Sequence, residues 1–127
     1  MPPSAPSSEY YQRTIQTFLT TNPDGTRSAV AAIEDPVHHM ELMAQVNPEG
    51  ILNQVCVADR SRPFNECRTA IARSGTVWNE VDLKKKEMIH DVRKRLDGCA
   101  HIAELVRYLS FAFQKKLDIY VFDWKRL

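Results

Sequence analysis

The first half of this chain alternates apolar and polar residues, and the second half does not. Alternation at every second position is typical of strands that bury one face, and it recurs in short runs between residues 10 and 59. Segments rich in proline and glycine separate the runs and predict turns. Their sequences are Asn-Pro-Asp-Gly, Asp-Pro and Asn-Pro-Glu-Gly. The pattern predicts four antiparallel strands, over residues 10–20, 27–34, 38–46 and 51–59.

The second half has the spacing of helices. Three helices are expected, over residues 66–73, 81–96 and 100–116, and the third has the clearest apolar stripe. Strands followed by helices predict an α+β fold, in which an antiparallel β-meander of three to four strands carries about three helices on one face. The last ten residues, from Asp118, either form a further short strand or dock on the core.

Length and composition predict one domain. The chain has 127 residues, of which 43% are hydrophobic, and this is enough for a single core. We expect a flexible tail over residues 1–8, which are rich in proline and serine, and a single α+β domain over residues 9–127. Seventeen basic and sixteen acidic residues nearly cancel, which argues against binding of nucleic acid through bulk charge.

The chain shows no signal for a membrane or for export. No apolar run approaches the about 20 residues that cross a bilayer, and the N-terminal residues lack the regions of a signal peptide. Three cysteines, an odd number, fit a reducing compartment better than a disulfide framework. We therefore expect no membrane partner and a cytoplasmic location.

The stretch Gly98-Cys99-Ala100-His101 is the strongest candidate for a functional site. Gly98 is expected to end one helix, which places Cys99 at the start of the next. The positive end of a helix dipole favours thiolate over thiol, and thiolates bind metals and attack electrophiles.

Two further residues lie at the ends of expected elements, where functional sites are usually found. These are His38, which begins the third strand, and Cys67, which lies near a helix start. Two thiolates with one or two imidazoles suit zinc or iron. We therefore expect a metal site made by His38, Cys67 and Cys99, with His101 either as a fourth ligand or as a residue that supports the ligands.

Other polar residues are interpreted more simply. Cys56 lies in the middle of a strand between two valines and is interpreted as a small core residue. His39 and His90 are interpreted as solvated. Glu104 follows His101 by about one helical turn, so it either orients that histidine, acts as an acid or base, or faces solvent.

Three short motifs suggest a family. They are His38-His39-Met40-Glu41-Leu42 as H-x-M-x-L, Pro63-Phe64-Asn65-Glu66-Cys67 as P-x-x-x-C, and Gly98 to Leu105, which is close to G-C-T-H-L-T-E-L. In this order, over roughly residues 10 to 114, the chain resembles an uncharacterised bacterial family of small proteins known only as a domain of unknown function. It departs from that family at Ala100 and Ala103, where threonines are usual, and this puts a shared substrate in doubt more than a shared metal.

The same motifs look distantly like iron–sulfur scaffold proteins of the IscU and NifU type. This resemblance implies an antiparallel meander followed by helices, with Cys67 and Cys99 at two cysteine positions and His38 at an aspartate position. The first scaffold cysteine falls on Pro36, so the resemblance implies an altered ligand set.

These observations predict a small metal-binding protein. The first hypothesis is a zinc- or iron-dependent enzyme of small-molecule catabolism with lyase or hydrolase chemistry, because an incomplete ligand set leaves room for a substrate. Zinc can lower the pKa of a bound water to about 7, and Glu104 is the expected catalytic acid or base.

The alternative hypotheses are a non-enzymatic metal or iron–sulfur carrier and a metal-free interaction protein. The expected cofactor is a zinc or iron ion rather than an iron–sulfur cluster. Expected partners are a small-molecule substrate or a metal-transfer protein, and a homo-oligomer is left open.

Overall fold

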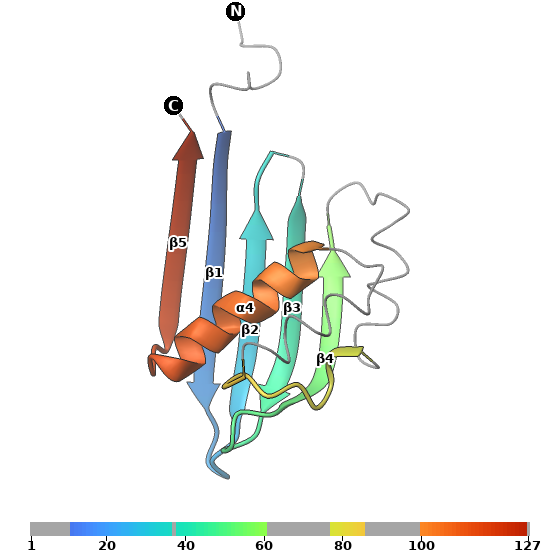
Figure 1. The fold of residues 1–127 in the computed structure, drawn as a ribbon, viewed down its shortest axis with the longest axis vertical. Helices are drawn as coiled ribbons and strands as arrows, with labels where there is room; N and C mark the ends of the chain where they lie inside the picture. The colour runs from blue at the N-terminus through green and yellow to red at the C-terminus, as the bar shows by residue number, and fades with distance from the viewer. Residues whose placement is uncertain (1–10, 37, 61–76, 86–99, 127) are drawn as a thin grey trace, which may run out of the picture.

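A computed structural model describes residues 11–36, 38–60, 77–85 and 100–126. In these residues a five-stranded antiparallel sheet carries a helix on one face (Figure 1). The elements in chain order are β1 (Tyr11–Thr21), β2 (Arg27–Glu34), β3 (His39–Val46), β4 (Leu52–Asp59), α4 (Ala100–Gln114) and β5 (Ile119–Arg126). The first four strands agree with the predicted ranges to within one residue at each end.

The strand order in the sheet is β4-β3-β2-β1-β5. The first four strands form a meander, because each pairs with the next along the chain. The last strand, β5, follows α4 and pairs with β1 at the outer edge of the sheet. Of the two alternatives for the C-terminal segment, the strand is the one observed.

The predicted α+β architecture of a three- to four-stranded meander followed by three helices is wrong. The sheet has five strands, and the chain returns to it after α4 instead of ending in helices. The start of the expected helix 81–96 is also wrong. The carbonyl of Val81 accepts a hydrogen bond of 2.8 Å from the N–H of Leu52, the first residue of β4, and the N–H of Leu83 donates one of 2.9 Å to the carbonyl of Gly50 in the turn before β4. Val81 and Leu83 are both buried, and their spacing of two is that of one face of a strand and not of one face of a helix. The expected helix 66–73 and residues 86–96 lie outside the described residues.

The third expected helix is present as α4, which crosses one face of the sheet diagonally (Figure 1). It presents an apolar stripe to the sheet, and the buried members of this stripe include Ile102, Leu105, Val106 and Leu109. The strand β2 offers small side chains, Ala29 and Ala31, on this covered face, and these let the helix pack closely. The core therefore lies between the sheet and α4. No helix in the described part of the chain is long and apolar enough to cross a membrane.

Cys56 is exposed and not in the core, contrary to the prediction. The pairing of β3 with β4 shifts register between Met43 and Gln45, and Gln54 has a positive φ of 52°. This irregularity adds a residue to β4 and reverses the alternation, so the buried positions after it are Val55 and Val57. As a result Cys56 faces outward opposite Met43.

Candidate functional site

The candidate site lies where the pairing of β1, β2 and β3 ends. The last cross-strand pairs join Thr14 to Glu34 and Glu34 to His39. Extending the same register by one position places three polar residues in a row across the three strands. Each has the same parity as the buried residues of its own strand, so the row lies on the face covered by α4. Its members are Arg13, Asp35 and His38.

Asp35 is at the centre of this row, and its side chain is 0% exposed. Its carboxylate accepts a hydrogen bond from the backbone N–H of His38 at 2.8 Å, and Nδ1 of the same histidine lies 3.0 Å from Oδ1. Arg13 donates to Oδ2 from Nε at 3.2 Å and approaches it with Nη2 at 3.1 Å. A buried carboxylate is stable only with such partners, which explains why the three side chains gather.

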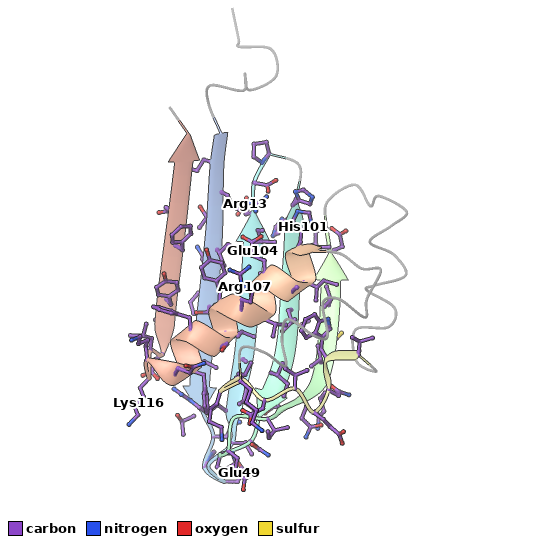
Figure 2. The ribbon with its side chains drawn as sticks, in the orientation of Figure 1. Arg13, Glu49, His101, Glu104, Arg107 and Lys116 are labelled. Atoms are coloured by element: carbon purple, nitrogen blue, oxygen red, sulfur yellow. The ribbon has the colours of Figure 1, made fainter. Side chains whose placement is uncertain are left out.

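The first turns of α4 add two side chains to the row. The ring of His101 lies over that of His38 with centroids 3.9 Å apart and planes inclined by 37°. Glu104 accepts hydrogen bonds from Nη1 of Arg13 at 3.1 and 3.4 Å. Residues three apart share a helix face, and Figure 2 shows Arg13, His101 and Glu104 together at the end of the sheet where α4 begins.

The surroundings of His101 favour its neutral form. Burial lowers the pKa of its imidazole, the neighbouring His38 and Arg13 lower it further, and Glu104 and Asp35 act in the opposite direction. Among the described residues of the cluster, one guanidinium faces two carboxylates. The side chains of Arg13, Asp35 and Glu104 together thus carry one excess negative charge, which suits a cation.

Aromatic side chains continue the helix face toward β5. Tyr108 follows Glu104 by one turn, and its ring lies 6.2 Å from that of Tyr120 and 5.5 Å from that of Phe122, measured between centroids. Burial raises the pKa of the Tyr108 phenol, and the nearby Glu104 and Tyr120 raise it further. The hydroxyl is therefore protonated at neutral pH and can donate a hydrogen bond.

The structure brings together two of the four predicted metal ligands, His38 and His101. Glu104 lies in the same cluster, but its described hydrogen bonds are with Arg13. Cys67 and Cys99 lie outside the described residues. Within the ranges that the structure describes, no group of three or more His, Cys, Asp or Glu side chains is arranged to hold a metal ion.

Sequence reasoning missed Arg13 and Asp35. The signal for Arg13 was its parity with Ile15, because a charge on the covered face of a strand needs a partner. Asp35 was interpreted only as the end of a strand. Its spacing of three from His38 is typical of an aspartate that accepts hydrogen bonds across a turn.

These residues define a class of structure in which an antiparallel sheet, covered on one face by a helix, holds a partly buried Arg–Asp–His row beneath that helix. The chain belongs to the family described as "Protein of unknown function (DUF2889)", whose model matches residues 17–114. The resemblance to an uncharacterised family is thereby confirmed. No curated protein and no solved structure matches the chain. The expected similarity to IscU and NifU is not supported.

Proposed function

We propose that this protein is a small zinc- or iron-dependent enzyme that acts on a small-molecule substrate by lyase or hydrolase chemistry. The observation that carries the proposal is the contact between His38 and His101. One imidazole directly precedes β3 and the other lies in the first turn of α4, and their centroids are 3.9 Å apart. Paired imidazoles supply the nitrogen donors that zinc and iron accept.

The described residues fit such an ion in two further respects. A metal binds the neutral imidazole, and burial lowers the pKa of His101 and so favours that form. The excess negative charge of the Arg13, Asp35 and Glu104 side chains also attracts a cation. Cys67 and Cys99 are proposed as the thiolate ligands on their sequence positions alone.

Each residue has a proposed role. When bound, the ion supplies Lewis acidity that polarises the substrate. Glu104 is the proposed acid or base, held in place by Arg13 through hydrogen bonds of 3.1 and 3.4 Å. The proposed setting is the cytoplasm.

The test is metal analysis of the purified protein and of matched variants. We expect wild type to carry a stoichiometric amount of zinc or iron, and we expect His38→Ala, His101→Ala, Cys67→Ser and Cys99→Ser to lose it. His39→Ala is the control for the histidines, because His39 is adjacent in sequence and its side chain is 42% exposed. Cys56→Ser is the control for the cysteines, because Cys56 is exposed on the opposite face.

Equal metal content in all six variants, or none in wild type even after titration with zinc and iron(II), would contradict the proposal. The enzymatic part is tested by screening metal-loaded wild type against hydrolase and lyase substrates. Glu104→Gln is expected to keep the metal and to lose the activity found. Full activity in this variant would remove Glu104 from the chemistry.

A further inference from the structure

Asp35 contacts His38 both through the backbone and through the ring. The backbone N–H donates to Oδ1 at 2.8 Å, and the ring Nδ1 lies 3.0 Å from Oδ1 and 3.1 Å from Oδ2. An ionised carboxylate only accepts hydrogen bonds, so the ring nitrogen that faces it carries the proton. In the neutral ring the lone pair is then on Nε2.

Arg13 in turn fixes the carboxylate of Asp35. Two of its nitrogens, Nε and Nη2, lie 3.2 and 3.1 Å from the same oxygen, Oδ2. A third nitrogen, Nη1, is bonded to Glu104 on α4, so the planar guanidinium is held at both ends. The carboxylate therefore cannot turn away from His38 without breaking these hydrogen bonds.

We propose that Asp35 and Arg13 are positioning residues for His38. Arg13 orients the carboxylate, and the carboxylate holds the proton of His38 on Nδ1 so that Nε2 is the donor to a divalent metal ion. Ligating histidines commonly have such a carboxylate partner, and loss of that partner weakens metal binding. The metal part of this inference rests on the proposed function, whereas the tautomer of His38 is a property of the metal-free chain.

The tautomer is read from long-range ¹H–¹⁵N NMR spectra of the metal-free protein. The spectra are taken at about pH 8.5, some two units above the ordinary histidine pKa of about 6.5. In wild type we expect His38 to carry its proton on Nδ1. In Asp35→Ala we expect the proton to move to Nε2. In Asp35→Asn we expect the fraction of His38 protonated on Nδ1 to lie between those of wild type and Asp35→Ala, because an amide has one acceptor oxygen instead of two. Glu34→Ala is the matched control, since Glu34 is the adjacent carboxylate and is exposed.

Zinc affinity is then measured by titration with zinc alone. Asp35→Ala and Arg13→Gln are expected to weaken binding by about 10- to 100-fold, and Glu34→Ala is expected to leave it unchanged. A far-ultraviolet circular dichroism spectrum that matches that of wild type establishes that each variant is folded.

The outcomes separate the inference from the proposed function. A proton on Nε2 of His38 in the wild-type protein overturns the inference. An unchanged His38 tautomer in folded Asp35→Ala also overturns it. If the tautomer follows Asp35 but wild type binds no zinc or iron, the tautomer assignment stands, and the metal role of His38 and the proposed function both fail. Unchanged zinc affinity in Asp35→Ala overturns the positioning role alone.

Discussion

Of the two glycines that the structure describes, Gly50 is the one whose replacement should destabilise the fold more. Its φ is +92°, and a Cβ placed on it would lie 2.8 Å from Cε1 of Phe113 on α4. Gly50→Ala therefore combines backbone strain of about 1–2 kcal/mol with overpacking of about 1–3 kcal/mol. We expect the free energy of unfolding, measured by urea denaturation, to fall by about 2–5 kcal/mol.

Gly25 is the matched control for this substitution. Its φ of +87° is nearly the same, but the nearest atom to an added Cβ is Cγ of Pro48 at 3.6 Å, an ordinary contact. Gly25→Ala should therefore lower the free energy of unfolding only by the cost of the backbone strain, about 1–2 kcal/mol. If Gly50→Ala and Gly25→Ala lower the free energy of unfolding equally, the ring of Phe113 moves away from the added methyl group without a cost in stability.

At the scale of elements, the end of α4 is closed by a residue that is not glycine. The N–H of Leu117 donates to the carbonyl of Ala112 at 2.9 Å and that of Lys116 to Phe113 at 3.2 Å, which is the Schellman pattern. Lys116 occupies the left-handed position with a φ of 57°. Glycine adopts that conformation more easily.

Lys116→Gly is therefore expected to stabilise the protein by up to about 1 kcal/mol. The paired control is Lys115→Gly, one residue earlier, where glycine gains nothing and is expected to cost about 0.5–1 kcal/mol. Both are measured by urea denaturation. A loss of stability in Lys116→Gly would mean that the lysine side chain contributes more than its backbone strain costs.

The elements that sequence could predict are those whose pattern is local. The strand ranges followed from alternation and turn residues, and α4 followed from its apolar stripe. The pairing of β5 with β1 could not be predicted, because it joins segments about a hundred residues apart. The exposure of Cys56 was missed because the irregularity beside Met43 reverses the alternation only once β3 and β4 are paired.

The same reasoning explains which parts of the candidate site could be predicted. His38 and His101 were named from their positions at element ends, and their contact depends on how α4 lies across the sheet. Asp35 and Arg13 are ordinary in sequence. Their connection depends on the register of three strands, which local patterns do not specify.

At the scale of the whole molecule, the two faces of the sheet differ. One face is covered by α4 and holds the core. The other carries a row that crosses all five strands by direct pairing, and this row comprises Ile119, Phe18, Val30, Met43 and Cys56. Phe18, Met43, Ile119 and Cys56 are exposed. The contribution of a strand side chain to the free energy of unfolding should therefore depend on which face of the sheet it lies on, and this alternates from one residue to the next.

Leu42 and Met43 test this dependence, because they are adjacent on β3 and face opposite sides. The side chain of Leu42 is fully buried, whereas Met43 is 40% exposed. Leu42→Ala is expected to cost about 2–5 kcal/mol, since it removes a core side chain and leaves a cavity. Met43→Ala is expected to change the free energy of unfolding by no more than about 0.5 kcal/mol. Thermal and urea denaturation of the two variants measure the difference. Comparable losses would mean that the face bearing Met43 is also packed in solution, because Met43 would then have to bury about as much apolar surface on folding as Leu42 does.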